Sequence, residues 1–119
     1  MPVLANGSKF VTHATSLTTT SDTDVYVVPN NFSSHVEHLM IGNNNSSNKN
    51  YTLKYYEADT STTHTLFNAH AVTGKGSESV FTIDKPLYLH EGDKIIIAAE
   101  TASTLTVVVA AEEFFDPNR

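Results

Sequence analysis

The chain has 119 residues, of which 39% are hydrophobic and 17% are charged, and its formal net charge is −6 at pH 7. A chain of this length and apolar content can bury one modest core, so the composition excludes a disordered protein and a membrane protein. The Lys residues are scattered and Arg119 is the only Arg, so we expect no nucleic-acid-binding face. Because the chain has no Cys, it can form neither a disulfide nor a thiolate zinc site.

Short runs in which apolar and polar residues alternate follow one another along the whole chain, separated by turns rich in Asn, Ser, Asp and Gly. This period of two predicts β-strands joined by short polar loops. The predicted strands are Lys9–Leu17, Asp24–Val28, Val36–Ile41, Tyr51–Glu57, His64–Asn68, Ser79–Ile83, Leu87–Leu89, Lys94–Ala99 and Leu105–Ala111. The best helical candidate, Ala98–Ser103, is too short to matter. We therefore predict an all-β fold, an antiparallel β-sandwich or jelly roll of eight or nine short strands, as a single domain over residues 1–119.

The phase of the alternation predicts which side chains face the core. Leu105, Val107 and Val109 share one face of the last strand. Val36 is out of phase with Leu39, which indicates either a bulge near His38 or a strand that is covered on both faces.

A tight turn is predicted between the seventh and eighth strands, at Glu91-Gly92-Asp93. Gly92 can adopt the positive φ that such a turn requires, and we expect the two flanking carboxylates to be solvated.

The two ends of the chain differ from the middle. Residues 1–8 form a predicted N-terminal arm, and residues 112–119 form a predicted acidic and aromatic C-terminal tail. Two adjacent Phe rings in a tail are unfavourable when exposed, so they either fold back on their own domain or dock on a neighbouring subunit. The candidate partner-contact residues are Val3, Leu4, Glu112, Glu113, Phe114 and Phe115. The N-terminus has no basic and apolar leader, so we expect synthesis in a reducing cytoplasm.

The residues with chemical potential do not form a recognisable catalytic or metal-binding motif. His35 and His38 are three residues apart, which in a regular strand places them on opposite faces. His64 and His70 could converge only through the fold, and a symmetry axis of an oligomer could gather copies of one His around an ion. Asp22 and Asp24 lack the rest of a calcium loop. Solvated roles are expected for two acidic pairs, Glu57 with Asp59 and Glu91 with Asp93. We predict no enzyme activity, no metal and no cofactor.

An alternative for the aromatic residues is a carbohydrate-binding groove. Its candidates are Tyr51, Tyr55, Tyr56, Tyr88 and Phe67. Core packing explains most of this set, and Tyr56 is the residue that strand parity leaves exposed.

Several features follow one another in a fixed order along residues 24–111: Val28-Pro29, Leu39 to Ser47, Leu53 to Tyr55, Pro86 to Leu89, Gly92-Asp93 to Ile97, and Thr106 to Val109. Their order resembles that in a group of small bacteriophage virion proteins. The ending Glu112 to Pro117 is similar to small virion proteins of marine podoviruses, including those that infect cyanobacteria.

This resemblance implies a β-sandwich accessory protein present in many copies on a virion. Its partners would be copies of itself and other virion proteins, either the portal and tail or the major capsid protein. A tail-associated ring or fibre-attachment role is slightly favoured over capsid decoration, and a carbohydrate-binding module for host recognition is a further alternative.

Overall fold

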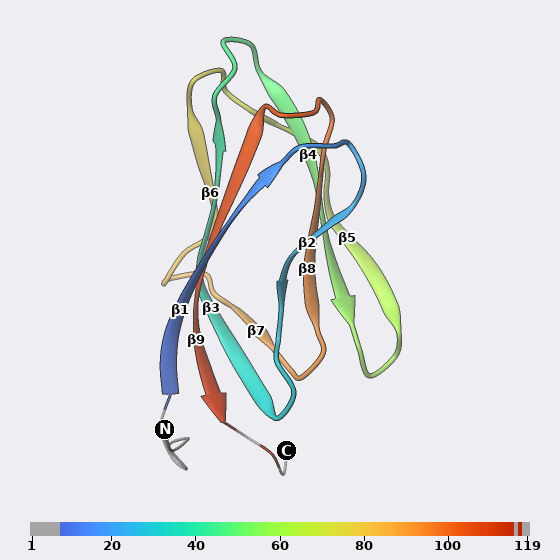
Figure 1. Cartoon of the computed structure of the whole chain (residues 1–119), viewed down its shortest axis with the longest axis vertical. Helices are drawn as coiled ribbons and strands as arrows, with labels where there is room; N and C mark the ends of the chain where they lie inside the picture. Colours follow the sequence, from blue (N-terminus) through green and yellow to red (C-terminus); the bar gives the residue numbers. More distant parts are fainter. Residues whose placement is uncertain (1–7, 116, 118–119) are drawn as a thin grey trace.

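The computed structural model describes residues 8–115 and 117, and these form nine β-strands in two antiparallel sheets (Figure 1). The strands are β1 (Ser8–Leu17), β2 (Thr23–Val27), β3 (Phe32–Asn43), β4 (Lys49–Glu57), β5 (Thr62–Val72), β6 (Ser77–Phe81), β7 (Leu87–Leu89), β8 (Lys94–Ala99) and β9 (Leu105–Phe115). In this part of the chain, no helix has the length and apolar character needed to cross a lipid bilayer. The all-β prediction is confirmed.

The strand order is that of a jelly roll. One sheet runs β1-β9-β3-β6, with β7 also pairing with β3, and the other runs β2-β8-β4-β5. Strands far apart in sequence therefore pair from the outside inward, β1 with β9, β2 with β8, β3 with β6 and β7, and β4 with β5. This is the topology of a long hairpin folded over into two layers, and it confirms the predicted jelly-roll-like sandwich.

The core lies between the two sheets and consists of the inward side chains that the alternation predicts. Leu105, Val107 and Val109 of β9 are buried, as are Ile95 and Ile97 of β8. Both strands are central in their sheets, which explains their high apolar content. Each such side chain stabilises the fold by about 1.5–3 kcal/mol relative to full exposure.

Of the two alternatives for β3, the structure shows the bulge, at Glu37. Val36 pairs with Ala111 and His38 pairs with Ala110, so Glu37 has no partner of its own in β9. The extra residue restores the phase of β3, because Val36 and Leu39 both face the core. His35 and His38 consequently share the outer face, and the prediction that they lie on opposite faces is wrong.

Several predicted strand ends are corrected by the structure. β3, β5 and β9 are longer than predicted, and β9 continues to Phe115 instead of ending at Ala111. β6 ends at Phe81, so Ile83 lies in the following turn and is 73% exposed. The polar and aromatic residues at these strand ends are in strands because they pair with neighbouring strands. The alternation within one segment does not reveal such pairing.

The Glu-Gly-Asp turn has the predicted backbone but a different role for its last residue. Gly92 has a φ of 84°. Asp93 is buried instead of solvated, and its carboxylate accepts hydrogen bonds from the backbone N–H groups of Ala58 and His90 and from the Tyr55 hydroxyl. Asp93 thus ties the turn to β4, which corrects the prediction of a solvated carboxylate.

Candidate functional site

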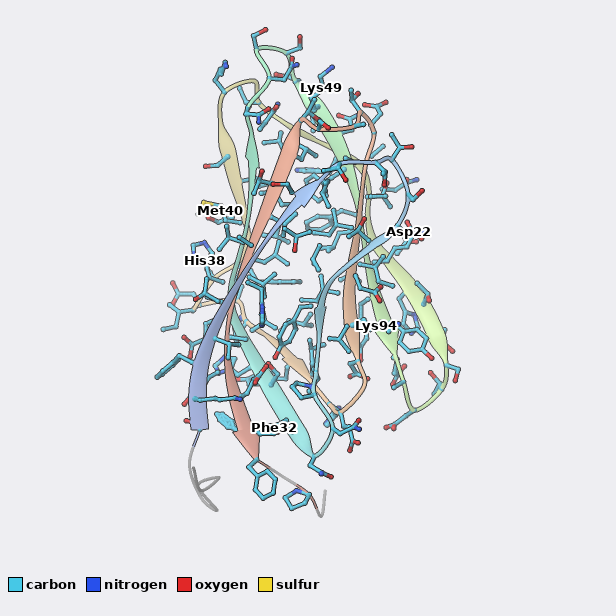
Figure 2. The ribbon with its side chains drawn as sticks, in the orientation of Figure 1. Asp22, Phe32, His38, Met40, Lys49 and Lys94 are labelled. Atoms are coloured by element: carbon cyan, nitrogen blue, oxygen red, sulfur yellow. The ribbon has the colours of Figure 1, made fainter. Side chains whose placement is uncertain are left out.

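The predicted C-terminal contact residues are the last residues of β9, at the end of the sandwich where β1 begins (Figure 1). Phe114 pairs with Ser8 on one side and Ser33 on the other, and Phe115 pairs with Phe32. The Phe115 and Phe32 rings meet edge to face with centroids 5.6 Å apart, and Figure 2 places Phe32 at this end of the molecule. The two Phe residues are half-buried on their own domain, while Val3, Leu4 and part of the predicted tail lie outside the described residues.

Glu113 points into the sandwich and is only 3% exposed. Its carboxylate accepts a hydrogen bond of 2.6 Å from the Tyr26 hydroxyl, which belongs to the opposite sheet. The Ser34 hydroxyl lies 2.8 Å from the Tyr26 oxygen, and the Lys9 ammonium lies 3.9 Å from Glu113. Burial and the adjacent carboxylate raise the pKa of Tyr26 above its usual value. Glu113 is therefore used to hold the two sheets together.

Glu112 has the opposite orientation and lies on the outer face of the five-stranded sheet. Directly paired positions form a row across four strands there, Phe10 of β1, Glu112 of β9, His35 of β3 and Tyr88 of β7. The Tyr88 ring stacks on the His35 ring with centroids 4.5 Å apart. The Glu37 carboxylate approaches His35 Nδ1 at 3.9 Å, and Ser8 donates a hydrogen bond of 2.5 Å to Glu112. We call His35, Glu37 and Glu112 the outer-face triad.

Beyond the outer-face triad, the positions of this outer face along β1, β9, β3 and β6 carry no Lys, Arg, Asp or Glu, and most of their side chains are small. These positions are paired with one another across the four strands, so their side chains share one face of the sheet. They are Thr12, Ala14, Ser16, Thr106, Val108, Ala110, His38, Met40, Gly42, Ser77 and Ser79. Figure 2 shows His38 and Met40 pointing away from the second sheet. We call these residues the flat face. None of them is a Lys, Arg, Asp or Glu.

The outer face of the four-stranded sheet differs from the flat face because it carries ion pairs between Lys and Asp. Lys54 pairs with Asp22 at 3.0 Å and Lys94 pairs with Asp24 at 3.2 Å. Lys94 also lies over the Tyr56 ring, 5.4 Å from its centroid. Asp22 and Asp24 thus bind separate Lys residues and do not converge on one calcium site. Among the described residues, the flat face and the outer face of the four-stranded sheet therefore differ sharply in charge.

The other sequence candidates have structural roles. The Glu57 carboxylate pairs with His64 at 3.4 Å. The proposed aromatic groove does not form as one surface, because Tyr51 is buried, Tyr56 lies on the four-stranded sheet and Tyr88 lies on the five-stranded sheet. Tyr88 is 67% exposed and borders a shallow groove whose lining also includes Ser33, His90 and Phe114.

Sequence reasoning missed Phe10 and named Tyr88 only as a groove candidate, without placing it beside the outer-face triad. Phe10 is 74% exposed and Tyr88 is 67% exposed. Phe10 could have been found by parity, because Val11 is its inward-facing neighbour. Tyr88 could have been placed only with the pairing of β7 on β3.

No protein-family model matches the chain, and no curated protein sequence is similar to it. The solved structures that resemble it in fold include the following two. A protein of Bacillus endospore appendages, described as a novel family of disulfide-linked pili, is 11% identical with a TM-score of 0.54, over 98% of this chain and 97% of that chain. The virus-like particle of the extra small virus of the giant freshwater prawn Macrobrachium rosenbergii contains a chain that is 13% identical with a TM-score of 0.46, over 96% of this chain and 82% of that chain. At these identities the likeness shows the fold alone.

Proposed function

We propose that this protein is a non-enzymatic structural subunit that assembles with copies of itself in a bacteriophage particle. The observation that carries the proposal is the flat face. Interface cores are depleted of charged residues, and a protein with a net charge of −6 has acidic groups to spare for a surface that only faces water. A face that spans four strands and carries small, neutral side chains suits close packing against another rigid β-surface.

The β1 edge adds a second contact surface. β1 pairs only with β9 among the described strands, so one side of its ten residues has backbone groups free to pair with another chain. The edge strand of the other sheet, β5, is less suitable because its pairing with β4 is interrupted by two register shifts and Ala69 has a φ of 54°. Such irregularities hinder the addition of a further strand.

The candidate contact residues at the C-terminal end of β9 lie beside the start of the β1 edge. Phe114 pairs with Ser8, the first residue of β1, so Glu112, Phe114 and Phe115 lie at the start of this edge strand. We propose that these three residues, together with Val3 and Leu4, contact a neighbouring subunit next to the β1 edge.

The setting that we propose is the virion, with the portal or tail ring, or the fibre attachment, favoured over capsid decoration. The order of motifs supports a phage protein, and the Bacillus appendage protein gives a precedent for a subunit of this fold in a polymer, a pilus. Its pili are disulfide-linked, whereas this chain has no Cys and would assemble through non-covalent contacts alone. The copy number per particle decides between the alternatives: tens of copies fit the tail, and hundreds fit capsid decoration.

Two matched substitutions test the flat face. Ala110 and Ala98 are both half-buried on the outer side of a central strand, Ala110 in β9 and Ala98 in β8. We expect the wild-type protein and Ala98→Glu to form a defined oligomer in light scattering after size exclusion, and Ala110→Glu to shift to monomer. A wild-type protein that is monomeric at high concentration, and that also fails to bind particles lacking it, would contradict the proposal.

Carbohydrate binding for host recognition is the second candidate, and the exposed Tyr88 beside its groove is the observation that favours it. An aromatic face next to polar groups can stack on a sugar ring. We expect a signal on a glycan array to be lost in Tyr88→Ala and kept in Tyr56→Ala, because Tyr56 lies on the other sheet and is covered by Lys94. Absence of any glycan signal would remove this candidate.

A further inference from the structure

The outer-face triad combines an imidazole and two carboxylates from two adjacent strands. One ligand atom from each of His35, Glu37 and Glu112 lies within 4.8 Å of the other two. His35 and Glu112 are a directly opposite pair between β3 and β9, and the bulge at Glu37 brings the second carboxylate to the same face. Because the three residues belong to two paired β-strands, the sheet holds their backbone positions relative to one another.

The His35 ring is oriented without hydrogen bonds to the described part of the chain. Its Nε2 atom is buried and has no partner there, and its Nδ1 atom lies 3.9 Å from Glu37, which is longer than a hydrogen bond. The ring is held by stacking on Tyr88 instead. A buried ring nitrogen without a partner is unfavourable, and bringing two carboxylates close to each other adds repulsion. A bound cation relieves the repulsion, and one with affinity for imidazole also uses the ring.

The neighbours of the outer-face triad resemble the surroundings of known metal ligands. Ser8 donates a hydrogen bond to Glu112, and such bonds orient ligating carboxylates. Phe10 and Tyr88 occupy the two ends of the row in which His35 and Glu112 lie.

We propose that His35, Glu37 and Glu112 bind a first-row divalent transition metal, with Zn²⁺ as the best fit. One imidazole nitrogen and two carboxylate oxygens match the ligand types of zinc sites, and three protein ligands leave a fourth tetrahedral position open. Ca²⁺ and Mg²⁺ fit less well, because they prefer oxygen ligands. This proposal does not rest on the proposed function, because a monomer contains all three ligands.

Tag-free protein freed of metal with a chelator tests the site directly. We expect calorimetric titration with ZnCl₂ to give one equivalent per chain, and Co²⁺ to give visible absorption bands typical of tetrahedral coordination. His35→Ala and Glu112→Gln should weaken zinc binding by about tenfold or more. His38→Ala is the matched control, since His38 lies on the same strand and face but bonds to Ser79 outside the outer-face triad. His64→Ala, which removes a His beside Glu57 on the other sheet, is a second control.

Three outcomes would overturn the proposal: no zinc binding by the wild type, equal binding by His35→Ala, or equally tight binding of Ca²⁺. Because a variant can fail to fold, the wild type supplies an independent readout. Addition of zinc should shift the imidazole nitrogen resonances of His35 and leave those of His64 unchanged, and the reverse pattern would contradict the assignment. Titration at a concentration where the protein is monomeric separates this result from the test of assembly.

Discussion

The hydroxyl of Tyr26 donates a hydrogen bond of 2.6 Å to Oε2 of Glu113, and these two residues belong to opposite sheets. Because Glu113 is an acceptor, the single proton of Tyr26 is used in this bond, and the Ser34 hydroxyl donates to the Tyr26 oxygen. This buried polar contact joins the two layers at one end of the sandwich.

Removal of the Tyr26 hydroxyl is expected to destabilise the protein. Tyr26→Phe leaves the buried Glu113 carboxylate without its closest donor, and hydrogen bonds to charged groups contribute about 1.5–3 kcal/mol. Urea denaturation should show a loss of this size. Tyr88→Phe is the control, because Tyr88 is exposed and the ring stacking on His35 is preserved. Equal stabilities of the two variants would mean that the contact between Tyr26 and Glu113 contributes nothing.

This contact also shows what local sequence could and could not predict. Alternation revealed the core positions of β9, and continuing the same parity places residue 113 inward. The two Glu residues nevertheless indicated the end of a strand, because the partner that makes a buried Glu113 tolerable is 87 residues away in β2. The outer-face triad depends likewise on the register between β3 and β9, which pairs His35 with Glu112. The change of phase in β3 was detectable within a single strand, but the choice between a bulge and a strand covered on both faces required the pairing of β3 with β9.

Alkaline pH is expected to destabilise the fold through its buried tyrosines. Burial raises the pKa of Tyr26 and Tyr51, and burial with the nearby Asp93 raises the pKa of Tyr55 to about 12. Since the unfolded value is about 10, the stability from these neutral hydroxyls is fully present below pH 10 and is lost as the pH rises toward 12. Urea denaturation between pH 8 and about 11.5 should show this decline, and Tyr26→Phe should show a shallower one. Identical slopes for the two proteins would exclude a contribution from Tyr26.

Gly74 is expected to be intolerant of any side chain. A Cβ atom at this position would overlap the backbone carbonyl of Ser46, in the loop that packs beside it. Backbone cannot move aside as a flexible side chain can, so Gly74→Ala should lower the free energy of unfolding by about 1–3 kcal/mol. Gly42→Ala is the matched control, because its nearest neighbour, the Thr106 carbonyl oxygen, would be 4.0 Å away. Thermal or urea unfolding compares the two, and similar losses in both would show that the close approach to Ser46 is unimportant.

Replacement of the buried carboxylate in the Glu-Gly-Asp turn is expected to loosen the end of β4. Asp93 accepts bonds at both oxygens, from Ala58 at one and from His90 and Tyr55 at the other. Asp93→Asn presents an N–H₂ group to one of these sets of donors, so at least one buried donor loses its acceptor, at about 1–3 kcal/mol. Hydrogen exchange should then become faster at the amide of Ala58 or of His90, together with a lower unfolding free energy. Asp59→Asn, at an exposed position in the neighbouring turn, controls for the loss of one negative charge. If both variants unfold at the same urea concentration as the wild type, Asp93 is not the tie between its turn and β4.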